Sequence, residues 1–334
     1  MNVISTLANK KISVFAPISI GNISVGFDNL GLAVSPINGQ LLGDVVHVKA
    51  SEDDNNHLVC IGHYQSSLPK LKEDNIIWHC LLEFNKLYGS SDNIRPIHLT
   101  LEKNAPICSG TGSSACSVVA GLKAINEFYD NPFSKKQLLK LMGKLEAKIS
   151  GSLHYDNVAP CYLGGLQLML EDEDRICQSL PIFEDCYWII SYPDIKVSTR
   201  MAREILPKSY SRQDVIESSR LLAGFIDASY RQDKEQAFSV LKDVIAEPYR
   251  RDLLPNFDTT KSELIENGCL AVGISGSGPT VFAVCDDIAK AEIAKKTLDS
   301  NYLPKNAELS DKAFTEICKV DRPGARIINP IREK

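Results

Sequence analysis

Residues 106–116 contain the residue types that are needed to hold a phosphate group. The stretch reads Pro-Ile-Cys-Ser-Gly-Thr-Gly-Ser-Ser-Ala-Cys and is followed by a run of small residues that predicts a helix. Gly110 and Gly112 allow a tight turn and a close approach of the backbone to a ligand. The free N–H groups and the dipole of a helix start favour phosphate, and the hydroxyls of Ser113 and Ser114 add donors. The stretch predicts a phosphate loop; a glycine turn with serine caps is the alternative.

Residues 106–116 match two common types of nucleotide-binding loop only in part. A Walker A loop ends in Gly-Lys-Ser/Thr, but no lysine follows Gly112. A dinucleotide fingerprint, G-x-G-x-x-G/A, is matched by Gly110, Gly112 and Ala115. That fingerprint also needs an acidic residue at the end of a second strand about 20 positions later. Residues 131–136 begin a predicted helix instead. An oxidoreductase that binds a dinucleotide at this loop is therefore an alternative function, but the acidic residue that it needs at the end of a strand is missing.

A third pattern, P-x-G-x-G-L-G-S-S-A, is the signature of the GHMP family of small-molecule kinases. The chain resembles it at Pro106, Gly110, Gly112 and residues 113–115. It differs at Cys108, where glycine is usual, and at Thr111, where leucine is usual. Cysteine is small, so we expect the loop to tolerate it. The difference at Cys108 nevertheless motivates one further rival, a catalytically silent binding module on the same fold.

Other segments extend the resemblance over about residues 11–327. Ala16-Pro17 with residues 21–31 is similar to the first motif of the family, and residues 273–280 are similar to its third motif. Within the family, the chain is similar to the branch that phosphorylates L-homoserine, in segments 150–161, 196–203 and 246–250. The resemblance therefore implies transfer of phosphate from ATP to the hydroxyl of L-homoserine, a step toward threonine. A GHMP kinase for another acceptor, such as mevalonate, is the nearest alternative.

The resemblance also implies which residues hold the nucleotide and its metal. The ATP-binding residues are the whole loop: Pro106, Ile107, Cys108, Ser109, Gly110, Thr111, Gly112, Ser113, Ser114, Ala115 and Cys116. Asn75 and Lys103 are the candidates beside the adenine, although Asn75 is also placed to cap a helix. Mg²⁺ prefers a few carboxylate oxygens together with phosphate oxygens. Glu146 is the expected magnesium ligand, with Ser113 or Ser114.

The acceptor needs groups that match a zwitterion with a terminal hydroxyl. A carboxylate calls for the planar fork of arginine, and Arg203 and Arg250 are the candidates. The expected contacts at the other groups are Asn22 and Asp28 for the ammonium, Asn157 for the carboxylate or hydroxyl, His154 to orient the site and Thr199 beside the reacting phosphate.

The resemblance implies catalysis by positioning and charge neutralisation, without a dedicated base. The catalytic residues are then Asn157, Glu146 and Thr199, and Asp28 is assigned to substrate binding. This is physically reasonable because the phosphoryl transition state is loose, and geometry alone can supply ~7–11 kcal/mol.

The elements that must position these residues predict an α+β fold. Strands are expected at 12–15, 44–49 and 97–101, an ordered loop between the first two at 17–31, and helices at 75–87 and 135–149. The second half has the order β-α…β-β-α-β of a ferredoxin-like split βαβ unit. Its elements are expected at 187–191, 199–206, 212–231, 233–245, 270–274, 280–284, 286–299 and 315–320. The resemblance implies a two-domain GHMP kinase fold, with a ribosomal-protein-S5-like ATP-binding domain at 1–172 and a ferredoxin-like domain at 173–334.

The composition limits the setting in which the protein works. The 334 residues carry a formal net charge of -5, with 44% hydrophobic and 24% charged residues, as in soluble globular proteins. Nucleic acid and anionic membranes are therefore not expected partners. No apolar run could span a bilayer, residues 1–11 lack a secretory signal, and the ten cysteines form no CxxC pair. These features predict a cytoplasmic protein with reduced thiols. Homodimers are common in the family.

Overall fold

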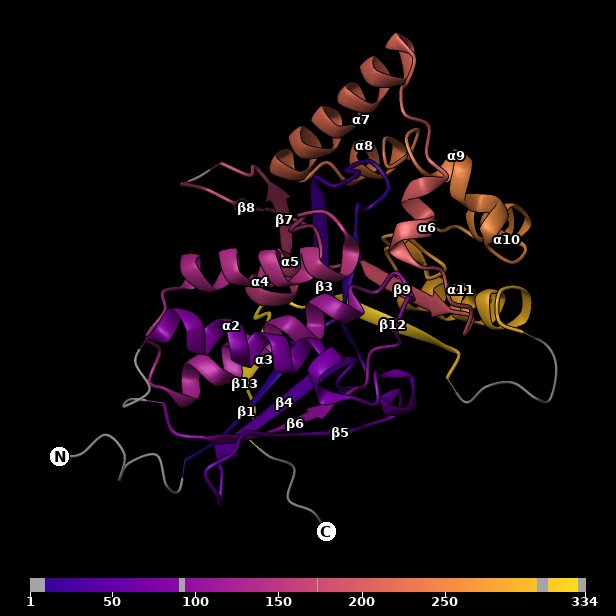
Figure 1. The fold of residues 1–334 in the computed structure, drawn as a ribbon. Coiled ribbons are helices and arrows are strands. Elements are labelled where there is room, and N and C mark those ends of the chain that lie inside the picture. The colour runs from indigo at the N-terminus through magenta and orange to yellow at the C-terminus, as the bar shows by residue number, and fades with distance from the viewer. Residues whose placement is uncertain (1–9, 90–93, 173, 305–311, 330–334) are drawn as a thin grey trace.

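The computed structural model describes residues 10–89, 94–172, 174–304 and 312–329 (Figure 1). The polar start at residues 1–9 and position 173, at the predicted domain boundary, lie outside the described residues. The helices and strands form two sheets with helices packed on them, so the expected α+β class is confirmed. No helix in the described ranges is both long and apolar enough to cross a bilayer.

The first sheet has five strands and is built by the N-terminal half and one C-terminal strand. Its order is β13 (Arg326–Ile327), β1 (Lys11–Pro17), β4 (Gly43–Ala50), β6 (Ile97–Glu102) and β5 (His57–Ile61). Only the β5–β6 pair is parallel. Burial alternates along β6, which has one face toward the core and one toward solvent. On the core side lie α2 (Ile76–Tyr88), α3 (Ser113–Phe128) and α4 (Lys135–Ser150) (Figure 1).

The second sheet joins the two halves of the chain. Its main order is β10 (Ala271–Ile274), β11 (Val281–Cys285), β9 (Tyr187–Tyr192), β12 (Phe314–Val320), β3 (Leu30–Pro36), β7 (Leu166–Met169) and β8 (Cys177–Leu180), and β2 (Ser19–Gly21) pairs with β3. The antiparallel strands β9 to β12, with α10 (Phe257–Glu266) and α11 (Ile288–Asn301), form the expected split βαβ unit. Strands β3 and β7 precede residue 172 but belong to the same sheet as strands β9 to β12 of the C-terminal half. The sheet therefore spans the predicted domain boundary at 172/173, and that boundary stays a prediction.

The remaining helices are short apart from one. They are α5 (Val158–Leu163), α6 (Thr199–Glu204), α7 (Arg212–Arg231), α8 (Lys234–Ser239) and α9 (Glu247–Arg250), with 3-10 turns at Gln65–Ser67, Lys72–Asp74 and Arg251–Leu253. The helix expected at 233–245 is wrong in length, since α8 ends at Ser239. The reason is the side chain of Asp243, which accepts hydrogen bonds from the N–H groups of residues 245, 246 and 247 and so starts a new turn.

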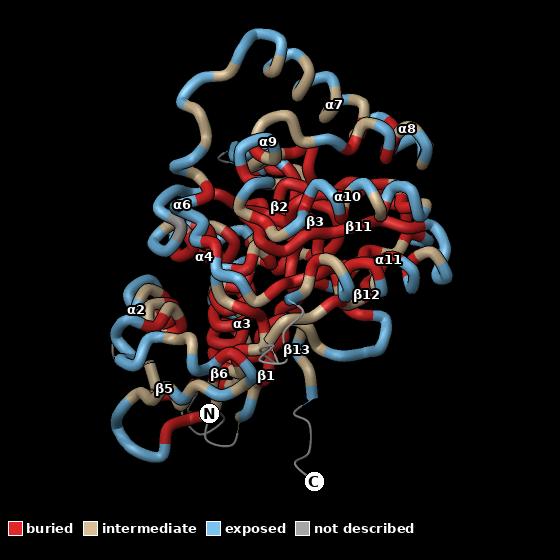
Figure 2. The backbone as a smooth tube through the Cα atoms, turned by 90° about the vertical axis from the view of Figure 1, so that its right-hand side faces the viewer, coloured by how far each residue is buried: buried red, intermediate tan, exposed pale blue. Residues whose placement is uncertain are grey.

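Helix α3 forms the centre of the core. Its small residues let it pack tightly against β1 and β4 on one side and against α2 and α4 on another. Figure 2 shows it buried along most of its length, unlike the exposed faces of α7 and α2. Helix α4 is fixed by a Ser134–Gln137 capping box and by Gly151, which closes its end with φ 87°. The two helices thereby hold the N-terminus of α3 next to α4.

Candidate active site

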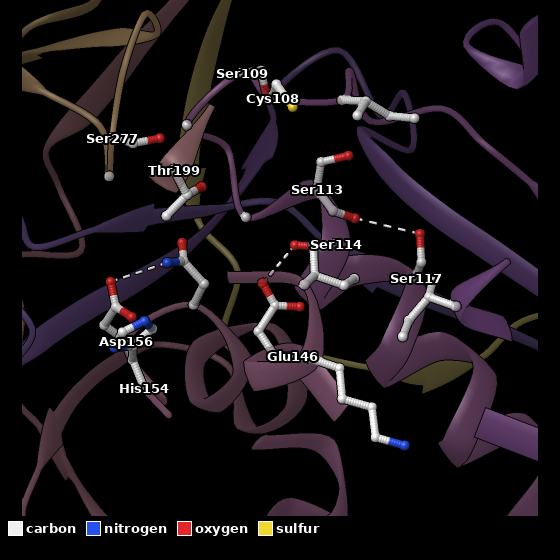
Figure 3. A pocket seen from close by; sticks show the side chains of 18 of the residues that line it. Cys108, Ser109, Ser113, Ser114, Ser117, Glu146, His154, Asp156, Thr199 and Ser277 are labelled. Carbon is white, nitrogen blue, oxygen red and sulfur yellow. Dashed lines mark hydrogen bonds between the residues drawn. The ribbon is translucent and has the colours of Figure 1, made fainter. Parts of the chain in front are cut away.

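A cavity of about 510 Å³ opens where the N-terminus of α3 faces α4 and the C-terminal half. Its wall combines the segment 22–28, the loop that precedes α3, α4 and the turn after it, α6, Arg250 and residues 276–277. In the view of Figure 3, Glu146 and Ser114 lie between Ser117 on one side and Thr199, Asp156 and His154 on the other. The cavity thus has a phosphate-loop end and a polar end.

Glycine is required at the centre of the loop because another backbone presses against it. Gly110 and Gly112 have φ of 82° and 66°, and a Cβ on Gly110 would lie 2.3 Å from the carbonyl oxygen of Ser275. The Ser275 hydroxyl donates to the Gly110 carbonyl at 2.8 Å, and the Thr280 N–H donates to the Ser109 carbonyl at 2.9 Å. The third motif therefore supports the loop from behind and leaves its other side facing the cavity.

Cys108 occupies a backbone conformation that explains the usual glycine. Its φ is 57°, in the left-handed region, and its side chain is exposed at the cavity wall. The carbonyl of Cys108 accepts a hydrogen bond from the Val197 N–H at 3.0 Å. The loop keeps its shape with cysteine at this position, at the steric cost that any side chain has there.

A buried ion pair fixes the start of the loop to the first turn of α3. Lys103 donates to Asp44 at 2.5 Å, to the Ser113 carbonyl at 2.9 Å and to the Ser117 hydroxyl at 3.0 Å. Asp44 also accepts from the N–H groups of residues 104 and 105. Lys103 lines the cavity, but these contacts tie it to the protein itself. Asp44 was not expected from the sequence, because it lies on β4 some distance along the chain.

Glu146 lies directly beside the N-terminus of α3. The Ser114 hydroxyl donates to Glu146 Oε1 at 2.5 Å (Figure 3). Burial raises the pKa of Glu146, while the bond from Ser114 and the charge of Lys103 lower it. Ser113 instead donates to the Ala105 carbonyl at 3.0 Å. A carboxylate and a hydroxyl next to a phosphate loop are oxygen donors of the kind that Mg²⁺ prefers, so these residues fit the ion.

Side chains of opposite charge are paired at the polar end of the cavity. Arg203 donates to both carboxylate oxygens of Asp28, at 3.0 and 2.7 Å. Arg250 is 3% exposed and donates to the carbonyls of Ala202 and Gly276 at 3.0 and 2.9 Å. Asn22 also reaches the Gly276 carbonyl, at 3.2 Å, and accepts from the Asp28 N–H. The first motif, α6 and α9 therefore meet at one point.

The guanidinium groups of both arginines lie over the ring of Phe27. The guanidinium carbon of Arg203 lies 5.6 Å from the ring centroid, and that of Arg250 lies 5.3 Å from it. Burial lowers the pKa of Arg250, and the neighbouring charge of Arg203 adds to that effect. An aromatic face offsets such repulsion through cation–π attraction. Phe27 was not selected from the sequence, although it stands beside Asp28 in the first motif.

Asp156 is a third residue that the sequence did not single out, after Asp44 and Phe27. It precedes Asn157, whose side-chain amide donates to Asp156 Oδ2 at 3.0 Å, and Asn157 Oδ1 accepts from the Ser19 hydroxyl at 2.9 Å. Burial raises the pKa of Asp156 to about 7, helped by the charges of Asp28 and Glu146 and opposed by Arg203. The only signal in the sequence was its position next to Asn157.

The cavity collects most of the residues expected from the sequence. The expected residues in its wall are Asn22, Asp28, Lys103, Ile107, Cys108, Ser109, Gly110, Gly112, Ser113, Ser114, Glu146, His154, Asn157, Thr199, Arg203 and Arg250. The wall also contains residues that were not assigned roles: Phe27, Ser67, Leu68, Pro69, Asp74, Ile76, His79, Ser117, Lys148, Ile149, Asp156, Gly276 and Ser277.

Five expected residues stand outside the wall, namely Asn75, Pro106, Thr111, Ala115 and Cys116. Four of them belong to the loop or to the first turn of α3 and face the core. Asn75 is 2% exposed, and its side chain caps α2 by accepting from the Ile77 N–H at 3.0 Å. Its neighbours Asp74 and Ile76 line the cavity, so Asn75 shapes this end of the cavity through the backbone.

Family models and solved structures match this chain. Residues 75–165 match the model of the GHMP kinases N terminal domain, and residues 225–304 match that of the GHMP kinases C terminal domain. The crystal structure of homoserine kinase from Cytophaga hutchinsonii is 31% identical, with a TM-score of 0.85, and the match covers 95% of this chain and 97% of that one.

More distant structures share the fold. Mevalonate kinase from L. major, solved with R-mevalonate, is 13% identical with a TM-score of 0.67 over 94% of this chain and 96% of that one. Phosphomevalonate kinase from Streptococcus pneumoniae is 14% identical with a TM-score of 0.64 over 96% of this chain and 99% of that one.

The two matched domains and the conserved architecture define a class of phosphotransferase. The chain belongs to the GHMP kinase family and has its two-domain fold. GHMP kinases use ATP, which implies a nucleotide substrate for this chain, and the dinucleotide interpretation of Gly110 and Gly112 is set aside.

Proposed function

We propose that this kinase phosphorylates L-homoserine to O-phospho-L-homoserine, in a step toward threonine. One observation carries the proposal. The cavity that contains the phosphate loop also contains Asp28, Arg203 and Arg250 in contact or near contact. A short amino acid carries an ammonium and a carboxylate close together and so needs both signs of charge in one place. The likeness to the Cytophaga hutchinsonii enzyme supports the same acceptor.

We assign the nucleotide end as follows. The backbone N–H groups of the Gly110–Ser114 bend would bind the phosphates of ATP. Glu146 and Ser114 would hold Mg²⁺, and Ser113 is less suited because its hydroxyl donates to the Ala105 carbonyl. The ion would neutralise charge on the transferring phosphate. Leu68, Pro69 and Ile76 offer an apolar surface for the adenine.

The acceptor end uses side chains from both halves of the chain. Arg203 and Arg250 would bind the carboxylate, and Asp28 with Asn22 would accept from the ammonium. Asn157 then faces the hydroxyl, His154 orients Arg203 through a contact of 3.3 Å, and Thr199 lies next to the transferring phosphate. Transfer relies mainly on positioning and charge neutralisation. Location in the cytoplasm and assembly as a homodimer complete the proposal.

A coupled ADP-release assay tests the acceptor. We expect ATP turnover that depends on L-homoserine and on Mg²⁺, with kcat/KM for homoserine far above that for mevalonate or galactose. Preferred phosphorylation of mevalonate would place the chain elsewhere in the family. Absence of turnover with every acceptor would favour the catalytically silent module.

A further inference from the structure

Lys148 lies in the last turn of α4 and lines the cavity, and none of the roles above uses it. Its ammonium group donates to Glu83 of α2 at 2.9 Å, and Figure 1 shows α4 running alongside α2. The same helix α2 contributes Ile76 and His79 to the cavity wall. Lys148 therefore belongs to the nucleotide end of the cavity, on the side where we place the adenine.

The phosphate loop itself brings no positively charged side chain to this end. Residues 106–116 contain neither lysine nor arginine, whereas a Walker A loop carries a lysine that reaches the β- and γ-phosphates. The N–H groups and the dipole at the start of α3 supply only partial charges. Asp74 adds a carboxylate to the same wall, and ATP remains an anion after it has bound one Mg²⁺. We therefore expect a cation from another part of the fold.

Four lysine and arginine side chains line the cavity among the described residues, namely Lys103, Lys148, Arg203 and Arg250. Lys103 is 1% exposed and is enclosed by Asp44 and the first turn of α3. Arg203 and Arg250 are held at the acceptor end by the contacts described above. Of these four side chains, Lys148 is the cation that remains available at the nucleotide end.

The ion pair with Glu83 leaves Lys148 able to change its partner. The side chains of Lys148 and Glu83 are 51% and 33% exposed, and an ion pair this exposed contributes little to stability. The ammonium is a compact charge on a flexible four-carbon stem, so rotation of the stem can carry it from Glu83 into the cavity. The phosphate chain of ATP offers more negative charge and more acceptor oxygens than one carboxylate does, so it competes well for the ammonium.

We propose that Lys148 is a further nucleotide-binding residue, which leaves Glu83 and binds the phosphate chain of ATP; the inference rests on the nucleotide site of the proposed function. The positive charge that a Walker A loop carries within its own sequence here comes from α4, two residues after Glu146. Glu83 keeps the ammonium beside the site while no nucleotide is bound.

Lys148→Gln and Glu83→Gln together separate this role from that of a structural ion pair. Titration calorimetry with ATP and Mg²⁺ measures the affinity. We expect Kd for ATP to rise by about tenfold in Lys148→Gln, on the scale of one charge-assisted contact. Glu83→Gln removes the competing carboxylate, so Kd for ATP should not rise. Equal weakening in both variants would mean that the pair only joins α2 to α4, and an unchanged Kd in Lys148→Gln would equally overturn the inference.

Adenosine shows whether the lost contact is one to phosphate. It keeps the base and the ribose but has no phosphate, so Lys148→Gln should bind adenosine as the wild type does. Lys148→Arg keeps the charge and should recover most of the affinity for ATP. A loss of affinity for adenosine as large as that for ATP would show that the substitution disturbs the adenine side, and would overturn the inference. Thermal melts of the variants check that each is folded.

These titrations contain no acceptor, so the inference and the proposed acceptor are tested separately. In turnover with homoserine, KM for ATP should rise in Lys148→Gln while KM for homoserine keeps its wild-type value. A wild type that bound no ATP would remove the proposed function and this inference with it. A wild type that binds ATP, with a Lys148→Gln variant that binds it equally well, removes only this inference.

Discussion

Asp28 and Arg203 bind each other through two hydrogen bonds across the cavity, at 2.7 and 3.0 Å. One side chain comes from the first motif and the other from α6, so the ion pair joins the two halves of the site. Each is about one-third exposed, and so the pair contributes little to stability. The pair places a positive and a negative group together, as the proposed zwitterionic substrate would require.

Replacing Arg203 by lysine should weaken the acceptor site. Lysine keeps the charge but cannot form the planar two-bond fork with Asp28 or with a substrate carboxylate. We expect KM for homoserine to rise by about tenfold, equivalent to ~1.4 kcal/mol, with KM for ATP unchanged. Steady-state kinetics with each substrate varied in turn measures this. An unchanged KM for homoserine would show that Arg203 does not touch the acceptor.

Arg250→Ala should have a stronger effect. The buried guanidinium anchors the carbonyls of Ala202 and Gly276, and its loss would also remove a charge-assisted partner of the substrate carboxylate. We expect KM for homoserine to rise by ~100-fold, from ~3 kcal/mol of lost binding. A thermal melt of the variant separates this loss from unfolding. A folded variant with wild-type KM would mean that the arginine has only a structural role.

Phe27→Leu tests whether the ring holds the two arginines. Leucine fills similar space but has no aromatic face, so ~1 kcal/mol of cation–π attraction should be lost. KM for homoserine should rise by about fivefold, kcat should hold, and Phe27→Tyr should behave as wild type. Equal kinetics of the leucine and tyrosine variants would argue against the cation–π role.

Glu146→Ala should act on the metal side. The carboxylate lies beside Ser114 at the start of α3, where it would hold Mg²⁺. We expect kcat to fall by ~100-fold or more, on the scale of losing one transition-state contact, and the Mg²⁺ concentration for half-maximal rate to rise. The measurement is a Mg²⁺ titration at saturating ATP and homoserine. A wild-type response to Mg²⁺ would contradict the assignment.

Asp156 should make stability depend on pH. Its pKa in the folded protein, about 7, lies above the ordinary value of 3.8. Between these values the folded state binds more protons than the unfolded state, so the stability contributed by this group falls as pH rises. Asparagine does not titrate. The free energy of unfolding of Asp156→Asn relative to wild type should therefore increase by ~2 kcal/mol from pH 5 to pH 8. Thermal melts of both proteins at the two pH values measure this difference. A constant difference would show that the pKa is not raised.

Local signals in the sequence predicted the local structure well. Helix α4 was expected at 135–149 and runs Lys135–Ser150, because its cap at Ser134 and its end at Gly151 are encoded within one stretch. The glycine turn before α3 was likewise predictable from adjacent residues. Helix α8 was predicted too long because the turn set by Asp243 depends on a side chain that also suits a helix surface.

The rest of the site depends on contacts between distant residues. Asp44 and Lys103 are 59 positions apart and meet only because β4 and β6 are neighbours in the sheet. Asp156 acquires its environment from β2, α4 and α6 together. Phe27 could be found only once both arginines had been placed over its ring. No periodicity or short motif reports such pairings.

The proposed function requires that the bend at Gly110–Ser114 binds the phosphates of ATP beside a pocket for a short hydroxylated amino acid. A crystal structure with a non-hydrolysable ATP analogue, Mg²⁺ and L-homoserine tests this most directly. We expect the phosphates at the N–H groups of the bend, the metal at Glu146, and the homoserine hydroxyl within hydrogen-bond distance of Asn157. A nucleotide that binds elsewhere while the bend stays empty would contradict the proposed function.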